Sequence, residues 1–162
     1  MDRQPHPSHL PWLDRMTARV PGYAGYGTPT QRRAAAHALR DALARHLTTL
    51  RTQLDEALAD CRRREAHSEI PAVERVAAHV ERILHRLRGF GTSEPFYSAP
   101  SLRPGQVDPI YAIDHAALDT AERLTHYFDV ADPSHNRLAA IEAGLKALEH
   151  TLDERAMLMR AV

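Results

Sequence analysis

Residues 31–66 read QRRAAAHALRDALARHLTTLRTQLDEALADCRRREA, a stretch without glycine or proline. Its apolar residues recur at spacings of three and four, which keeps them on one narrow stripe of a helix. The residues on the stripe are Leu39, Leu43, Leu47, Leu50, Leu54, Leu58 and Cys61. The stretch predicts one uninterrupted helix of about 54 Å, at a rise of about 1.5 Å per residue. Because a helix this long needs several shorter helices to cover its stripe, it decides the fold.

Four other stretches carry apolar residues at helical spacing, at 11–20, 71–88, 109–128 and 133–160. The long helix is expected to stop near His67 or Ser68, because Ile70 precedes Pro71 and so disfavours helical angles. The connection that follows is short enough to permit only an antiparallel hairpin. We therefore predict an all-α antiparallel helical bundle. It has four main helices, one of them about 36 residues long, plus a short N-terminal helix. Residues 11–162 are expected to form a single domain, preceded by a flexible tail at 1–10.

Two irregular segments are rich in aromatic residues. The first, 20–29, reads VPGYAGYGTP and is expected to be an ordered loop, with Thr28 or Thr30 capping the long helix. The second, 89–109, contains Phe96 and Tyr97 and four prolines, and loops of this length are often functional. We expect the aromatic residues of the two segments to meet at the end of the long helix.

Composition favours an ordinary globular chain, with 43% hydrophobic and 26% charged residues among 162. Cys61 is the only cysteine and lies on the apolar stripe, so we interpret it as a buried, inert thiol. The polar, proline-rich N-terminus lacks the apolar core of a signal peptide, and no apolar run reaches bilayer length, so we expect a cytoplasmic protein. Residues 1–107 are net basic and residues 108–162 net acidic, which favours contacts between the two parts or between two copies.

The helix at 109–128 carries the best metal-ligand pattern in the chain. His115, Asp119, Glu122 and His126 are spaced by four, three and four, which places them on one stripe. Imidazole and carboxylate groups are good ligands for zinc or iron. The stripe lies almost opposite the apolar face, however, so it is expected to face solvent or a partner rather than the core. We predict no metal, no cofactor and no small-molecule substrate. Because the chain also lacks a nucleophile elbow and a phosphate-binding glycine loop, we expect no enzyme.

Arginines make the predicted helical hairpin basic, most densely at Arg62, Arg63 and Arg64. Such a face could attract nucleic acid or anionic lipid. Acidic residues are interleaved with the arginines, so we expect an internally paired surface and do not expect nucleic acid as a partner.

The segment VPGYAGY at 20–26, followed by Arg32 and Arg33 and the Leu-rich helix, resembles a family of uncharacterised small bacterial helical proteins. These share a Pro-Gly-Tyr-x-Gly-Tyr loop at this place, and residues 107–114 resemble the entry into their next helix. The resemblance implies a helical protein with an association to scaffold and membrane-stress proteins. It implies no activity.

Together these patterns predict a non-catalytic interaction or scaffold protein that binds a protein partner or a second copy of itself. Aromatic loop residues form the candidate contact surface, because loops on a rigid scaffold often carry recognition. They are Tyr23, Tyr26, Phe96, Tyr97 and Tyr111. A second interpretation is that these side chains only complete the core. The alternative functions are a peripheral membrane-stress protein that binds anionic lipid and a metal-binding helical-bundle enzyme.

Overall fold

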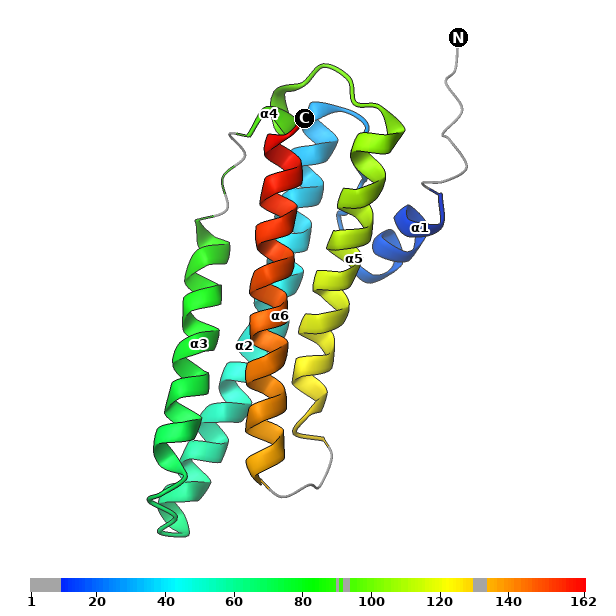
Figure 1. The fold of residues 1–162 in the computed structure, drawn as a ribbon. Helices are drawn as coiled ribbons and strands as arrows, with labels where there is room; N and C mark the ends of the chain where they lie inside the picture. Colours follow the sequence, from blue (N-terminus) through cyan, green and yellow to red (C-terminus); the bar gives the residue numbers. More distant parts are fainter. Residues whose placement is uncertain (1–9, 90, 92–93, 130–133) are drawn as a thin grey trace. The chain divides into compact units, whose positions relative to one another are not determined.

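All the secondary structure in the described part of the chain is helical (Figure 1). The computed structural model describes residues 10–89, 91, 94–129 and 134–162, so the predicted tail lies almost wholly outside it. The helices are α1 (Leu10–Arg19), α2 (Pro29–Arg63), α3 (Ile70–Arg88), α4 (Pro95–Ser98), α5 (Pro104–His126) and α6 (Ser134–Arg160). The predicted all-α class is confirmed. None of these helices combines the length and the apolar character needed to span a bilayer.

α2 is the helix that the leucine stripe predicts, and it runs unbroken for 35 residues. Its start is fixed by a capping box, in which two side chains satisfy each other's backbone N–H groups. The Gln31 N–H donates to Thr28 Oγ1 at 3.2 Å, and the Thr28 N–H donates to Gln31 Oε1 at 2.9 Å. Thr28, one of the two predicted caps, is therefore confirmed. All the stripe residues are buried except Leu58, which is half-buried.

α2 ends at Arg63, earlier than the predicted end near His67 or Ser68. The Ala66 N–H donates to the Cys61 carbonyl at 2.9 Å and the Glu65 N–H donates to the Arg62 carbonyl at 3.2 Å. These two bonds form a Schellman motif, which places its C′ residue in the left-handed region. That residue is Glu65, with a φ of 56°. The sequence pattern missed this end because glutamate, unlike glycine, is no signal for a helix terminus.

α3 folds back along the later part of α2, as the short connection predicts (Figure 1). Every residue of its predicted apolar face is buried. These residues are Val73, Val76, Ala77, Val80, Ile83, Leu84 and Leu87. The hairpin prediction is therefore confirmed.

The prediction that 89–109 is irregular is wrong at two places. Residues Pro95–Ser98 form the short helix α4, whose Phe96 and Tyr97 are buried. α5 begins at Pro104 rather than at the predicted Pro109, because a proline fits the first position of a helix. Pro109 lies inside α5 and cannot donate to the carbonyl of Gly105. Since Gly105 is exposed, water can reach that carbonyl.

α6 carries the second apolar seam. Ile141, Leu145, Leu148, Leu152 and Met159 are buried as predicted, and Leu138 is half-buried. The predicted start of this helix at residue 133 lies outside the described residues.

The described residues divide into two compact groups. The first unit draws on 1–42, 90–118 and 151–162, and the second draws on 43–89 and 119–150. α2, α5 and α6 each contribute one part to each unit. The predicted single domain stays a prediction, and the two units are described one at a time.

The second unit buries a core that is almost purely apolar. Its fully or nearly fully buried side chains include Leu47, Leu50, Leu54, Val76, Val80, Ile83, Leu87, Leu124, Ile141, Leu145 and Leu148. Gly144 lets helices approach closely, since a Cβ there would lie 2.6 Å from Leu124 Cδ2. Polar contacts flank this core, among them one between His79 Nε2 and Glu149 Oε2 at 2.9 Å and one from Gln53 Nε2 to the Thr125 carbonyl at 3.0 Å.

Candidate functional site

A buried polar network occupies the centre of the first unit. Asp114 of α5 is 0% exposed and Arg155 of α6 is 1% exposed. Arg155 Nε donates to Asp114 Oδ1 at 2.6 Å. On the other carboxylate oxygen, the Tyr23 hydroxyl donates at 2.7 Å and the Tyr26 hydroxyl donates as well. The buried carboxylate is thus matched by one cation and two hydroxyl donors, which a buried charge requires.

Further side chains extend this network. Arg155 Nη2 donates to the Tyr26 hydroxyl oxygen at 3.3 Å. The Tyr97 hydroxyl and Arg155 Nη1 lie 3.4 Å and 3.3 Å from Met159 Sδ. The Tyr26 N–H donates to the Tyr111 hydroxyl oxygen at 2.8 Å. The network therefore ties the tyrosine loop at 20–29 to α4, α5 and α6.

Burial and the Asp114 carboxylate raise the pKa of Tyr23 and of Tyr26 well above the ordinary value of 10.0. Burial also raises the pKa of Tyr97 and of Tyr111. For Arg155, burial alone would lower the pKa, but Asp114 with its tyrosine neighbours raises it well above its ordinary value. These tyrosine hydroxyls and the guanidinium therefore keep their protons near neutral pH. General acid–base catalysis needs a pKa near the working pH, so they are better suited to holding structure.

Arg32 of α2 forms a second buried polar centre in this unit and is 0% exposed. Its guanidinium donates to four backbone carbonyls, those of Tyr26, Gly27, Phe96 and Ala99, at 2.7–3.2 Å. Burial, with help from the charge of Arg33, lowers its pKa from the ordinary value. Arg32 thereby joins the two aromatic segments through their backbones, independently of the side chains they carry.

Glycines let the tyrosine loop approach α1 and α5. Gly22 and Gly25 have φ values of 84° and 80°, in the region that other residues avoid. A Cβ at Gly25 would lie 2.8 Å from the Tyr111 hydroxyl and 3.0 Å from Leu13 Cδ1. The loop conformation and its close packing both require glycine at this position.

The predicted contact residues all lie in the first unit, and each is 5% exposed or less. These are Tyr23, Tyr26, Phe96, Tyr97 and Tyr111. The rings of Tyr26 and Phe96 lie 5.1 Å apart, so the prediction that the two aromatic segments meet is confirmed. Their side chains mostly contact one another and help to complete the core. Their role in binding a partner stays a prediction.

A pocket of about 300 Å³ opens beside the tyrosine loop, and we call it the loop pocket. Two of the predicted contact residues, Tyr26 and Tyr111, contribute to its wall. Its remaining lining residues are Leu13, Ala24, Gly27, Gln31, Leu102, Pro104 and Val107. Leu13 and Leu102 are half-buried, so the pocket presents aliphatic surface next to two rings held in place by the buried network.

The candidate metal ligands have individual contacts within their own units. In the first unit, His115 Nε2 lies 3.2 Å from Arg19 Nη1, and its ring lies 5.1 Å from that of Trp12. In the second unit, His126 is exposed and its Nδ1 lies 2.9 Å from the Glu122 carbonyl oxygen. Asp119 and Glu122 are half-buried. Over the described part of the chain, no group of three or more His, Cys, Asp or Glu is arranged to hold a metal ion.

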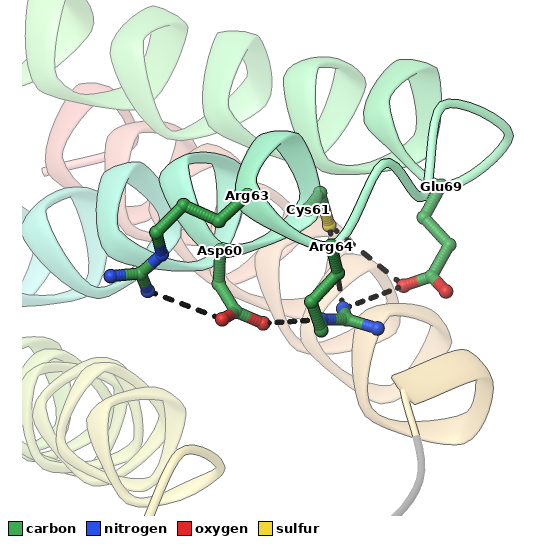
Figure 2. A network of polar contacts seen from close by, with 5 residues as sticks. All are labelled: Asp60, Cys61, Arg63, Arg64 and Glu69. Carbon is green, nitrogen blue, oxygen red and sulfur yellow. Dashed lines mark hydrogen bonds and ion pairs between the residues drawn. The ribbon is translucent and has the colours of Figure 1, made fainter.

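The arginine-rich end of α2 forms an ion-pair cluster in the second unit (Figure 2). Asp60 lies between Arg63 Nη2 at 3.1 Å and Arg64 Nε at 2.7 Å. Arg64 Nη2 also lies 3.5 Å from Glu69 Oε2 and 3.9 Å from Cys61 Sγ. The Arg64 hydrogen bond lowers the pKa of Asp60. These pairs confirm the predicted internally paired surface at this hairpin, and the burial of Cys61 is confirmed as well.

Sequence reasoning missed Arg32, Asp114 and Arg155, although the sequence carried a signal for the last two. The α6 seam has a gap of seven between Leu152 and Met159, and Arg155 occupies the vacant position. Asp114 is four residues after Ile110 and three before Ala117, on the apolar stripe of α5. Opposite charges on two apolar stripes predict a buried ion pair, because neither charge is stable there alone.

The chain matches no family model, and comparison with curated proteins and with solved structures gives no significant match. The likeness of the tyrosine loop to that of small helical proteins therefore remains a likeness of sequence pattern.

Proposed function

We propose that this chain is a non-catalytic helical protein that binds a protein partner at the loop pocket. One observation carries the proposal: a pocket with an aliphatic and aromatic lining opens beside a loop that buried hydrogen bonds hold in place. A rigid, preformed apolar surface favours binding, because little conformational entropy is lost when a partner docks. Apolar and aromatic side chains are also the groups that contribute most at the centres of protein interfaces.

The electrostatics of the network behind the pocket fit this role. Tyr26 and Tyr111 form part of the pocket wall and keep their protons near neutral pH, since burial raises the pKa of each. Tyr26 is fixed through its hydroxyl and its backbone N–H. The wall therefore has a fixed shape and carries no side chain prepared for proton transfer.

Photo-crosslinking in cells of the natural source tests this function. A photoreactive phenylalanine replaces Ala24, which is exposed and lines the pocket, or Ala34, an exposed alanine of α2 in the same unit outside the lining. We expect a discrete heavier adduct from position 24 and none from position 34. An adduct of twice the chain mass would identify a second copy as the partner. Identical patterns from both positions, or no adduct from position 24, would contradict the proposal.

The two alternative functions have tests of their own. Binding to anionic lipid predicts that the chain floats with phosphatidylglycerol vesicles at low salt and is released at high salt. A metal-binding enzyme predicts a stoichiometric transition metal in the purified chain by elemental analysis. A positive result in either measurement would favour that alternative over the interaction protein.

A further inference from the structure

A pocket of about 510 Å³ opens in the second unit, and we call it the hairpin pocket. Its wall is formed by the later part of α2, the start of α3, the residues that follow α5 and the start of α6. Apolar surface comes from Ala57, Val73, Phe128 and Leu138. The volume lies within the range of small-molecule sites, so the pocket has room for an organic ligand rather than only for an ion.

Much of the charge on this wall is already matched within the chain. The lining holds three guanidinium groups and four carboxylates. Figure 2 shows how two of the guanidinium groups are used: Asp60 lies between Arg63 and Arg64, and Arg64 also reaches Glu69. These four side chains form a matched set of two cations and two anions. A charged ligand therefore has to be recognised by the other polar groups of the lining.

The remaining carboxylates of the lining are those of Glu56 and Asp129. Both side chains are exposed, and neither carboxylate accepts a hydrogen bond or forms an ion pair within the part of the chain that the structure describes. Gln53 adds a third acceptor to the lining. Its Nε2 donates to the Thr125 carbonyl at 3.0 Å, whereas its Oε1 is buried and accepts from no described residue. Because a buried acceptor without a donor is unfavourable, these groups favour a ligand that supplies donors.

Arg137 is the third cation of the lining and lies over the ring of Phe128, 5.2 Å from its centroid. Its Nε makes no hydrogen bond within the described residues, although the residue has other contacts. The contact with Phe128 shows that this ring face accepts a cation. When Arg137 is counted against Glu56 and Asp129, the lining keeps one negative charge, which attracts a cationic ligand.

We propose that the hairpin pocket binds a small aliphatic amine. An amine is protonated near neutral pH, as a lysine side chain is, and its ammonium group donates to the carboxylates of Glu56 and Asp129. Its aliphatic chain packs on the apolar part of the wall. The inference departs from the sequence-based prediction, which included no small-molecule substrate. It is independent of the proposed function, because it concerns a different pocket in the other unit.

Isothermal titration calorimetry of the full chain with cadaverine tests the inference, with pentanediol and glutarate as its neutral and anionic counterparts of the same chain length. We expect cadaverine to bind and the other two compounds not to bind. Glu56→Gln together with Asp129→Asn keeps the shape of both side chains and removes their charges, so cadaverine should bind about tenfold more weakly. Arg137→Gln removes the opposing cation, so cadaverine should bind about threefold more tightly.

Matched controls locate the binding. Ala57→Trp fills the pocket and should abolish binding, whereas Ala59→Trp adds the same ring at an exposed position of the same helix outside the lining. Glu81→Gln removes an exposed carboxylate of α3 that does not line the pocket. Both controls should bind cadaverine like the parent chain. Circular dichroism verifies that each variant folds, and if Ala57→Trp does not, the variant that lacks both carboxylates decides.

Several outcomes would overturn the inference. Equal binding of pentanediol would show that the pocket recognises no charge, and tighter binding of glutarate, weakened by Arg137→Gln, would show that it prefers an anion. Absence of cadaverine binding at millimolar concentration, or unchanged binding in a folded Ala57→Trp, would contradict it as well. Lysine blocked at its amino and carboxyl groups carries the ammonium group of a protein side chain. If blocked lysine binds and cadaverine does not, the pocket recognises a lysine of a protein, and the small amine is wrong.

Discussion

The two units of this chain stabilise their cores in different ways. The second unit packs aliphatic side chains such as Leu50, Ile83 and Leu145, each 0% exposed. The first unit buries two arginines, an aspartate and four tyrosines, joined by directed hydrogen bonds. Apolar packing tolerates changes of side-chain shape that conserve volume. Removing the partner of a buried polar group, in contrast, destabilises the folded state, because that group is left without a hydrogen bond. The first unit should therefore be the more sensitive to conservative substitution, and it is the unit that holds the loop pocket.

Removing the central carboxylate should have the largest effect. Asp114→Ala leaves Arg155 buried without its anion, so we expect the free energy of unfolding to fall by about 3–5 kcal/mol. The measurement is urea unfolding followed by circular dichroism. The double variant Asp114→Leu with Arg155→Met should be more stable than Asp114→Ala, because it leaves no buried charge unpaired. If Asp114→Ala lowered the free energy of unfolding by less than about 1 kcal/mol, the proposed difference between the two units would be wrong.

Two conservative substitutions sharpen the contrast directly. Tyr26→Phe removes one hydroxyl from the network, and we expect it to lower the free energy of unfolding by about 1–3 kcal/mol. Leu47→Met changes the shape of a side chain that is 0% exposed in the second unit, and we expect a loss below about 1.5 kcal/mol. Urea midpoints measured side by side give the comparison. If the leucine substitution proves the more costly, the first unit is not the more sensitive of the two.

Alkaline pH should act on the first unit through its tyrosines. The pKa values of Tyr23 and Tyr26 are raised well above 10.0 by burial and Asp114. Above pH 10.0 the tyrosines of the unfolded chain lose protons that the folded chain retains. The free energy of unfolding therefore declines as the pH rises above 10.0. The expected slope is about 1.4 kcal/mol per pH unit for each such tyrosine. Urea unfolding at increasing pH measures it, and the Tyr23→Phe, Tyr26→Phe double variant should show a shallower decline.

The smallest predicted effect concerns the end of α2 in the second unit. Glu65 adopts a left-handed backbone conformation, which is higher in energy for residues that have a Cβ than for glycine. Glu65→Gly should therefore raise the free energy of unfolding by about 0.5–1 kcal/mol. Thermal unfolding measures the gain, and Glu56→Gly, inside the same helix, is the control that should destabilise. Destabilisation by both substitutions would contradict the Schellman assignment.

Much of the helical architecture follows from local patterns in the sequence. The leucine spacing placed α2, and the valine and isoleucine spacing placed α3, because one face of each helix must be apolar to pack. Boundaries were predicted less well. α5 extends through Pro109, which lies inside the helix. α2 closes on Glu65, because hydrogen bonds of the folded turn rather than a glycine set its end.

The sequence by itself determined the five longer helices, their apolar faces and the antiparallel turn between α2 and α3, because these depend on residues close together in the chain. Only the tertiary structure paired Asp114 with Arg155 and joined Tyr23 and Tyr26 to the same carboxylate, from segments far apart in sequence. The loop pocket likewise exists only where α1, the tyrosine loop and α5 meet. Such a site depends on the directions of side chains across long loops, and helical periodicity carries no information about those directions.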